Sequence, residues 1–467
     1  MEASNLRLHE NASWSDAMII RLLTLAALVL LLVRMAIVHT AKPAETPANG
    51  IVTLEMCVWG MPFENDLYMK VYIPEFERQN PGIKVRFQHF EDYPNRVLLS
   101  HAGGIAPDVI REFSQTGMAW TRRGLNMPLD KYIDGPEGIE RNDFIPVLWD
   151  SLKYGGQTYG VPQDINLLGL FYNKDLFDKA GLAYPNANWT WSDLKNAVDK
   201  LTIDKDGDGD PEQKGLDMAW GGDMFRAFMY QNGGRMWDGD RAAFASPETA
   251  EALRFYRSLM KTYSLTRSNQ GRGGLGPDKF FTTGRVAMYM DGSWMVPSVS
   301  KSAPKGFRFG VAPLPRGKTA STVSGSCCWS IDKDTKNPEA AWKLVRFLSG
   351  NWALKKYWQT LWVAPPARWS ALRSPEFHEV TGIEGGPPAI TDKATFQDRC
   401  AWVPEVLENG WTTLEYANPY TDRMMVHFNE AVDKVLIENM DPATALKQAA
   451  KETDEQITEA KRSEAVR

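Results

Sequence analysis

Cysteine and histidine are both scarce in this chain. Its 467 residues include only four cysteines and six histidines. Four scattered cysteines are too few for a disulfide scaffold, and neither they nor the histidines have the spacing of a zinc site. Two interpretations of the cysteines stay open, disulfides formed in an oxidising compartment or buried thiols. The cysteines are Cys57, Cys327, Cys328 and Cys400.

An excess of positive charge is also missing. Lysine and arginine total 53 against 58 acidic residues, a net charge of -5, so nothing electrostatic indicates a nucleic-acid partner. No nucleophile elbow, P-loop or HExxH helix occurs. A hydrophobic fraction of 43% and the length indicate a globular protein of two or three domains. We expect a monomer that requires no cofactor.

Long apolar runs are missing except near the N-terminus. Residues 22–33 (LLTLAALVLLLV) carry no charge and lie between Arg21 and Arg34. This length is typical of a signal peptide and falls short of the roughly 20 residues of a spanning helix. Either translation starts at Met18 and the peptide is cleaved near residues 40–44, or residues 35–38 extend the run into a membrane anchor. In both cases residues 1–50 precede the folded part, which we expect outside the cytoplasm.

Strand and helix patterns alternate after this segment. Strand–helix–strand at this rhythm predicts an α/β fold with a parallel sheet covered on both faces. Strands are predicted at 51–58, 83–90, 107–110, 159–162 and 167–172. Helices are predicted at 66–79, 191–201, 248–260, 339–348 and 443–460, with Thr190 or Ser192 as the N-cap of the second.

Nine sequence blocks, in order, resemble the extracellular solute-binding protein family 1, the maltose-binding-protein type. The most specific is YGGQTYGVPQDINLLGLFYNKDLFDKAGL at 154–182. The others are YIPEFERQNPGIKV, APDVI, LDKYID, YQNGGRMW, FFTTGRVAMYMDGSW, FGVAPLP, GSCCWSIDKDTKNPEAAWKLVRFLSG and DPATALKQAAKE. They cover nearly all of the chain after the N-terminal segment.

This resemblance implies a two-lobed, periplasmic-binding-protein type II fold with mainly parallel sheets. Lobe 1 would comprise residues 51–164 and 309–350, and lobe 2 residues 165–308 and 351–467. The chain would cross between lobes near Asp164, near residues 307–311 and near residues 349–352. The implied function is capture of a carbohydrate between the lobes and delivery to the permease of an ABC transporter.

Sugars are held by aromatic faces and by planar polar side chains, and ligands of α/β sheets lie at the carboxyl ends of strands. Trp59 follows the first strand, and Trp294 falls where the family carries a stacking aromatic. Glu112 follows APDVI, in a loop that faces the cleft in this family. The full set of expected ligand-binding residues is Trp59, Glu112, Gln163, Asp164, Asp223, Asn232, Trp294, Gly325, Ser326 and Arg368.

An acidic segment fits the first half of a calcium-binding loop. Its D-x-D-x-D-G spacing brings alternate carboxylates to one point, and Gly209 makes the turn. The twelfth position is Gly215 instead of glutamate, so a last ligand would come from Glu212, Asp217 or elsewhere. The alternative is a solvated acidic turn. The candidate ligands of this structural calcium are Asp204, Asp206, Asp208, Asp210 and Glu212.

Two other functions stay open from the sequence. A carbohydrate-active enzyme also uses tryptophans and paired carboxylates, and Asp164 with Glu112 would be the acid–base pair. The resemblance favours hydroxyl recognition by these residues, so we expect no enzymatic activity. A membrane-tethered ligand-sensing subunit is the third possibility.

Overall fold

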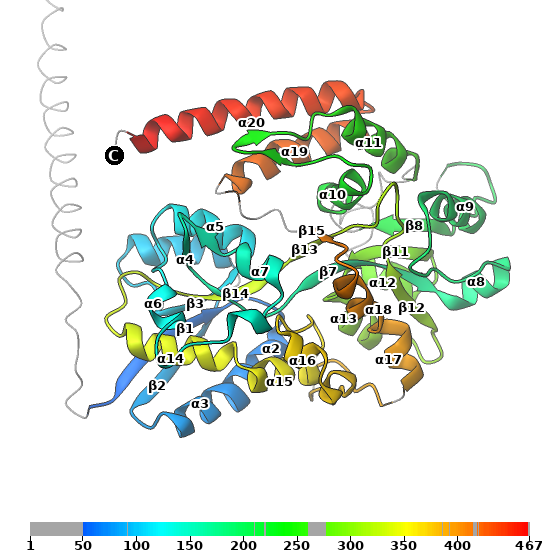
Figure 1. The fold of residues 1–467 in the computed structure, drawn as a ribbon. Helices are drawn as coiled ribbons and strands as arrows, with labels where there is room; N and C mark the ends of the chain where they lie inside the picture. The colour runs from blue at the N-terminus through cyan, green and yellow to red at the C-terminus, as the bar shows by residue number, and fades with distance from the viewer. Residues whose placement is uncertain are drawn as a thin grey trace, which may run out of the picture.

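The computed structural model describes residues 50–90, 92–209, 211–218, 221–259, 277–384, 386–391, 393–413, 418 and 420–465. The chain forms two α/β lobes, each built on one sheet (Figure 1). The apolar run at 22–33 and the linker at 42–49 lie outside the described residues. Within the described residues, no helix has both the length and the apolar character needed to cross a membrane.

Lobe 1 is built on a five-stranded sheet whose central strands are buried on both faces. Its order is β2 (Ile83–His89), β1 (Val52–Val58), β3 (Val109–Phe113), β14 (Cys327–Ile331) and β6 (Val161–Pro162). Along β1, Leu54 and Met56 pack into one hydrophobic cluster, whereas Cys57 packs into another on the opposite face. This alternation follows from the two-residue period of a strand. The expected α/β layering is confirmed.

Helices cover both faces of this sheet, as Figure 1 shows. One face carries α4 (Tyr93–Ala102) and α5 (Ser114–Arg122). The other carries α2 (Pro62–Leu67), α3 (Ile73–Gln79), α14 (Pro338–Leu348) and α15 (Asn351–Leu361). A π-helical turn, η1 (Tyr68–Tyr72), joins α2 to α3. Smaller elements are α6 (Asp130–Ile133), η2 (Arg141–Asp143), α7 (Pro146–Asp150), β4 (Lys153–Tyr154), β5 (Gln157–Thr158), α16 (Trp369–Leu372) and η4 (Pro375–His378).

Lobe 2 is built on a six-stranded sheet around β7 (Asn166–Asn173). Its order is β15 (Thr412–Thr413), β13 (Thr322–Gly325), β7, β11 (Val286–Gly292) and β8 (Lys214–Met218), with β12 (Phe309–Pro313) also paired to β7. One face carries α10 (Gly221–Gln231), α11 (Pro247–Leu259), α19 (Thr421–Leu436) and α20 (Pro442–Ala465). The other carries α12 (Pro277–Thr282), α13 (Met295–Ser302), α17 (Lys393–Arg399) and α18 (Trp402–Glu408). At the outer end lie α8 (Lys174–Ala180) and α9 (Trp191–Leu201), and β9 (Trp237–Asp238) pairs with β10 (Arg241–Ala242).

Among the described strands, each sheet contains one that runs against the rest. These are β14 in lobe 1 and β7 in lobe 2. Both are the strands that the chain enters directly from the other sheet, after Pro162 and after Gly325. A short connection leaves one sheet at the carboxyl ends of its strands and reaches the other sheet at the carboxyl ends of its strands as well. The strand that begins there must therefore run antiparallel to its neighbours.

Two of the three expected crossovers lie elsewhere. The connection around Asp164 does run from sheet to sheet. However, β12 and β13 both pair with β7, so the second crossover lies at Ser326 and not near residues 307–311. The third also comes later, because α15 still packs on lobe 1 through Tyr72, whose hydroxyl donates to the Ala353 carbonyl. The chain returns to lobe 2 between η4 and α17.

Candidate functional site

Each sheet has one edge at which the crossovers enter and leave it, and these two edges face each other. In lobe 1 this edge holds the ends of β1, β3 and β6, and in lobe 2 it holds the ends of β11 and β13 and the start of β7. Side chains from both lobes gather here because the connections are short. Ligands of open α/β sheets lie at such edges, which makes this edge the candidate site.

Three half-buried aromatic side chains mark this edge, one after each of three strands. Trp59 follows β1, Phe113 ends β3 and Trp294 follows β11. Trp59 and Phe113 meet edge to face, with ring centroids 6.1 Å apart and planes at 88°. Such rings provide both the apolar faces and the partial exposure that stacking on a sugar requires.

Glycine permits the close approach of two of these rings. The Phe113 ring lies on Gly325 at the end of β13, where an added Cβ would come within 2.5 Å of the ring. The Trp294 ring likewise lies on Gly292, so closely that a Cβ there would overlap it. A residue with any side chain would displace either ring. Phe113 therefore links lobe 1 to the lobe 2 sheet by direct contact.

Backbone hydrogen bonds continue this chain of contacts into lobe 2. Gly325 pairs with Asn166 at the start of β7. The Ser293 amide, next to Trp294, donates to the Leu167 carbonyl at 2.8 Å. These contacts and hydrogen bonds thus connect the backbone segments of both lobes that carry the three aromatics. Trp59, Gly325 and Trp294 were expected from the sequence, whereas Phe113 was not.

The buried side chain of Arg111 packs against Trp59, one member of the aromatic pair. The Arg111 guanidinium lies 5.4 Å from the Trp59 ring centroid and donates to the Trp59 carbonyl at 2.8 Å. It also donates to Glu64 Oε2 at 2.9 Å and to the Tyr357 hydroxyl at 2.9 Å. Its second nitrogen lies 3.5 Å from Asp164 Oδ2. This network joins β1, α2, β3, α15 and the first crossover, and it fixes the position of Trp59.

Asp164 and Gln163 form the crossover itself. Asp164 is buried and accepts hydrogen bonds from the Cys327 amide at 2.8 Å and from Asn166 Nδ2 at 3.0 Å. Burial raises the pKa of Asp164 to about 6, and Arg111 opposes this rise. The buried side-chain amide of Gln163 has no hydrogen-bond partner among the described residues. Asp164 thus joins the two reversed strands, and the unsatisfied Gln163 amide can hydrogen-bond a polar ligand.

Glu112 does not face the site, contrary to expectation. Its side chain is buried under α5, in contact with Gly117, and Asn126 Nδ2 donates to it at 3.1 Å. Burial raises its pKa to about 7. The expected strand ended at residue 110, but β3 continues to Phe113. Because successive strand residues point to opposite faces, Phe113 takes the place that was predicted for Glu112.

Ser326 is also buried, in the second crossover. Its carbonyl accepts from the Ser114 amide at 2.9 Å, and its hydroxyl donates to the Cys327 carbonyl at 3.0 Å. The first interaction fastens the start of α5 to the crossover, and the second lies within the crossover. Ser326 therefore positions the edge instead of presenting its hydroxyl to a ligand.

The four cysteines are buried and unpaired.

Three predicted residues do not join the site as described. Asn232 Nδ2 donates to the Glu248 carbonyl at 2.7 Å and so fastens the end of α10 to α11. Arg368 Nε donates to the Ser349 carbonyl at 2.9 Å, within lobe 1. Both side chains are buried and have structural partners, and their roles as ligand contacts stay predictions. Asp223 lies in α10, and its side chain is outside the described residues.

The acidic segment after α9 gathers three carboxylates. Oxygens of Asp204, Asp206 and Asp208 lie within 4.8 Å of one another, and all three residues are exposed. Glu212 closes the loop by accepting from the Lys205 amide at 2.9 Å. Asp210 lies outside the described residues. The calcium site stays a prediction.

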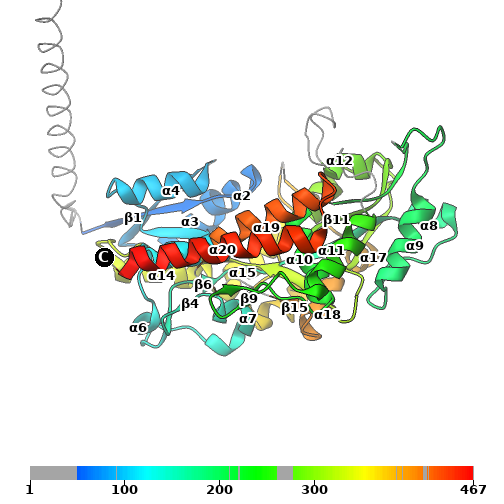
Figure 2. The same ribbon diagram turned by 90° about the horizontal axis from the view of Figure 1, so that it is seen from above.

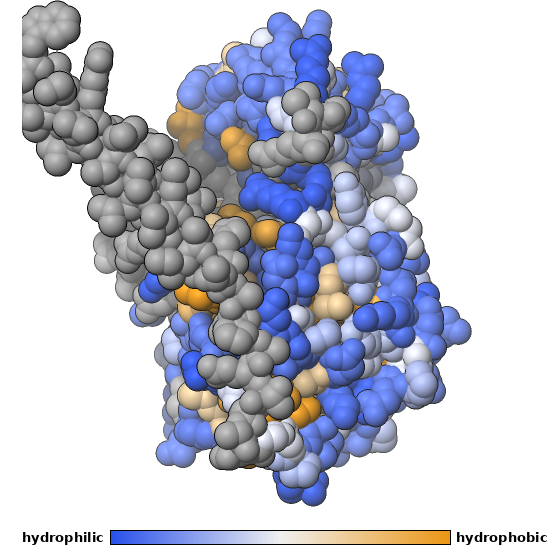
Figure 3. Space-filling model, turned by 90° about the vertical axis from the view of Figure 1, so that its left-hand side faces the viewer, coloured by the Kyte–Doolittle hydropathy of each residue, from blue (hydrophilic) through white to orange (hydrophobic). Residues whose placement is uncertain are grey.

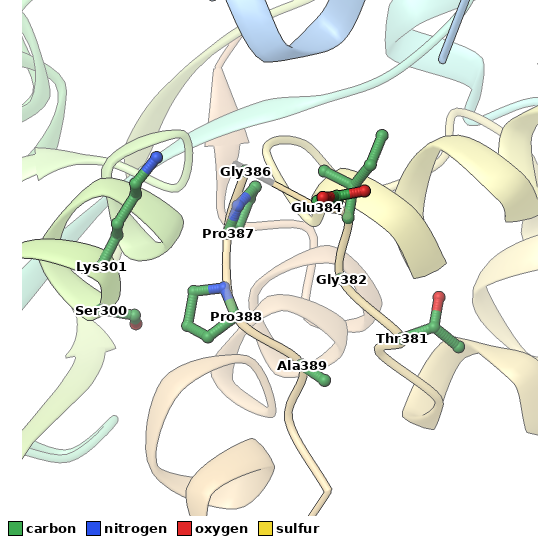
Figure 4. A pocket seen from close by; sticks show the side chains of 10 residues that line it. Ser300, Lys301, Thr381, Gly382, Glu384, Gly386, Pro387, Pro388 and Ala389 are labelled. Atoms are coloured by element: carbon green, nitrogen blue, oxygen red, sulfur yellow. The ribbon is translucent and has the colours of Figure 1, made fainter. Parts of the chain in front are cut away.

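A cavity of about 420 Å³ lies elsewhere, between α13 and a Gly- and Pro-rich loop (Figure 4). None of the predicted ligand residues lines it, and neither do the three aromatics. Its wall has no aromatic ring, so it lacks a stacking surface for a sugar. It is lined by Ser300, Lys301, Thr381, Gly382, Ile383, Glu384, Gly386, Pro387, Pro388 and Ala389.

Comparison with known proteins agrees with this architecture. The family model described as bacterial extracellular solute-binding protein matches residues 63–353, more than half of the chain. A binding protein of Brucella abortus is 28% identical over 282 residues, which are 58% of this chain and 66% of the relative, slightly under two thirds. The multiple sugar-binding protein of Streptococcus mutans is 24% identical over 312 residues, 63% of this chain and 71% of its own.

A solved structure is similar over a larger share of the chain. An ABC substrate-binding protein from Listeria monocytogenes, in complex with cycloalternan, has a TM-score of 0.75 and 25% identity. The superposition covers 87% of this chain and 99% of the Listeria chain. The family match and the shared two-lobed fold show that this chain belongs to the bacterial extracellular solute-binding protein family.

Proposed function

We propose that this protein captures a carbohydrate between its two lobes, outside the cytoplasm, and delivers it to the permease of an ABC transporter. One observation carries the proposal. Three half-buried aromatic rings, Trp59, Phe113 and Trp294, lie where the ends of strands from both sheets meet. Aromatic faces cover the apolar C–H patches of sugar rings.

The relatives support the choice of ligand class. The Streptococcus mutans relative is named a multiple sugar-binding protein, and the Listeria structure is a complex with cycloalternan. Both ligand classes present C–H faces and hydroxyls to the protein.

Ligand capture follows from the two-lobed arrangement. A ligand that touches both lobes stabilises the closed state by the difference between its affinities for the closed and open states. The two direct crossovers, at residues 163–165 and at Ser326, are where the lobes would rotate. The permease would then recognise closure and not the chemistry of the ligand.

The two carboxyl groups considered for catalysis are poorly placed for it. Glu112 lies under α5, and the Oδ1 atom of Asp164 is occupied by the Cys327 amide and Asn166. A general acid or base must reach the reacting atom of the substrate. Neither group does so in this arrangement, which supports binding without turnover.

The test is ligand binding by the purified, untagged chain and by three tryptophan variants. Thermal shift and calorimetry would screen glucose- and mannose-based sugars, polyols, amino acids and glycerol phosphates. Trp59→Ala and Trp294→Ala should each weaken the affinity at least tenfold, about 1.4 kcal/mol. Trp352→Ala is the matched control, because this tryptophan on α15 is 42% exposed and lies outside the aromatic edge.

The outcomes separate the alternatives. Sugar binding that is lost in both site variants and kept in the control supports the proposal. Binding of only a non-sugar would overturn the carbohydrate assignment, and equal affinity in all variants would overturn the site. Chromatography of the released sugar adds the enzymatic control, because a binding protein returns its ligand unchanged.

A further inference from the structure

The last two helices form an antiparallel pair on the outer face of lobe 2. Figures 1 and 2 both show α19 and α20 side by side, with α20 outermost. Their contact is tied at one place by Arg423 of α19, which donates to the Gln456 carbonyl of α20 at 3.4 Å. One helical turn further along α19, His427 lies on the same face. What this histidine does is not explained by packing alone.

Two carboxylates approach the His427 ring from different helices. Glu430 comes from the next turn of α19, and Glu452 comes from α20. His427 Nδ1 lies 3.5 Å from Glu430 Oε2 and 3.4 Å from Glu452 Oε2. One ligand atom from each of the three residues lies within 4.8 Å of the others. Gln448 donates to Glu452 Oε1 at 2.9 Å. The other oxygen of Glu452, Oε2, is the one that approaches His427.

Hydrogen bonding does not account for this arrangement. Both nitrogens of His427 are buried, and neither has a hydrogen-bond partner among the described residues. The two distances from Nδ1 are longer than the 2.7–3.2 Å of a typical N–H···O bond. Glu430 and Glu452 are also held close to each other, and two nearby carboxylates repel each other. A bound cation would satisfy Nδ1 and remove this repulsion.

We propose that His427, Glu430 and Glu452 bind a transition-metal ion of the zinc type. Zinc–nitrogen and zinc–oxygen bonds of about 2.0–2.2 Å in a tetrahedron place neighbouring ligand atoms about 3.3–3.6 Å apart. The two measured separations, 3.4 and 3.5 Å, fall in this range. One imidazole and two carboxylates suit zinc better than calcium, which takes six to eight oxygen ligands.

The site is open enough for an ion to enter. Glu430 has a 54% exposed side chain, and Glu452 a 37% exposed one, whereas His427 is only 12% exposed. The three residues occupy three positions of a tetrahedron and leave the fourth to water. The metal would clip α19 to α20. Because Tyr420, the residue before α19, contacts Arg122 of α5 in lobe 1, the clip steadies one border between the lobes.

The test uses the untagged, EDTA-treated full chain, with zinc chloride as the probe. Calorimetry should show one zinc ion per chain, and cobalt(II) should give the intense visible absorption of a tetrahedral site. His427→Ala and Glu430→Gln should each weaken zinc binding at least tenfold. Glu430 is exposed, so its variant should fold even if the buried histidine variant does not.

Two controls separate this site from other acidic positions. Glu459→Gln changes an exposed glutamate further along α20, and Asp206→Asn changes the acidic loop after α9. Both should bind zinc as the unchanged chain does. No zinc binding by the unchanged chain, equal binding by all four variants, or loss only in Asp206→Asn would each overturn the proposal.

Discussion

Replacing Arg111 with methionine leaves two buried carboxyl groups without their shared cation. Arg111 is 3% exposed and holds Glu64 at 2.9 Å and Asp164 at 3.5 Å. Removing one partner of a buried ion pair costs about 3–5 kcal/mol, because the remaining charge has lost both water and its partner. This cost includes the loss of the hydrogen bonds from Arg111 to the Trp59 carbonyl and to the Tyr357 hydroxyl. We expect Arg111→Met to lower the free energy of unfolding by about 3–5 kcal/mol.

The penalty should depend on pH in a defined direction. Burial already raises the pKa of Asp164 to about 6, although Arg111 opposes the rise. Without Arg111 that pKa rises further, so the carboxyl stays protonated and uncharged over a wider range. The loss should therefore be smaller at pH 5 than at pH 8, because the uncharged acid needs no cation.

Urea unfolding followed by tryptophan fluorescence measures both effects. Arg78→Met is the matched control, since Arg78 pairs with Glu75 at the surface and its side chain is 70% exposed. Exposed pairs contribute about 0–1 kcal/mol. The double variant Arg111→Met with Glu64→Met should recover part of the loss, because it removes both partners. A cost for Arg111→Met equal to that of Arg78→Met, or no recovery in the double variant, would refute the reasoning.

Three further predictions concern burial, close packing and the contact between lobes. Burial raises the pKa of Glu112 from 4.5 to about 7, so its contribution to stability is full below pH 4.5 and is lost as pH rises through 7. Glu112→Gln should reduce the loss of unfolding free energy between pH 5 and 8, by up to about 3 kcal/mol in urea titrations. Gly325→Ala should cost about 1–3 kcal/mol, measured in the same way, because the new Cβ would press on Phe113. Arg122→Ala removes a cation 4.8 Å from the Tyr420 ring across the lobes and should raise the radius of gyration in small-angle X-ray scattering.

Two of these predictions have a matched control variant. Gly82→Ala adds a Cβ where no atom lies within 4 Å and should leave stability nearly unchanged. Arg123→Ala removes the exposed arginine next to Arg122 and should not change the scattering. A pH profile of Glu112→Gln parallel to that of the unchanged chain, equal costs at both glycines, or equal scattering for both arginine variants would contradict the respective prediction.

Local patterns predicted five helical segments, because caps and prolines act on neighbouring residues. The helix predicted at 191–201 is α9, and Thr190 caps it by accepting from the Asp193 amide at 3.3 Å. The helix predicted at 66–79 begins earlier, at Pro62, and contains the π turn η1. Pro74 lies just after that turn and has no amide hydrogen to donate, which disrupts regular helical bonding there. The spacing of apolar residues could not show this irregularity.

The site was predicted in part, for a reason that its residues make plain. Trp59 and Trp294 each follow a strand, and the position of a strand's end can be estimated from its apolar run. Phe113 was missed because β3 includes Arg111 and Glu112, two charged residues that ordinarily end a buried strand. Both are tolerated because partners from distant parts of the chain satisfy them, Glu64 for the first and Asn126 for the second.

The division of apolar residues between surface and core could also be predicted only in part. Where its residues are described, the face in Figure 3 is mainly hydrophilic, with apolar residues in small separate groups. Two large buried clusters cover the two sides of the lobe 2 sheet, and one of them continues into lobe 1. The 43% apolar composition predicted a globular protein, but not the continuity of this core between the lobes.

The second crossover shows where local reasoning must fail. Residues 322–331 (TVSGSCCWSI) are one short continuous segment, yet β13 and β14 belong to different sheets, with only Ser326 between them. What separates them is pairing, since β13 bonds to β7 and β14 to β3. Pairing depends on residues more than 150 positions away, which no local period records. The same crossover sets Gly325 against Phe113, so the contact that joins the two lobes at the site arises from the part of the fold that the sequence pattern conceals.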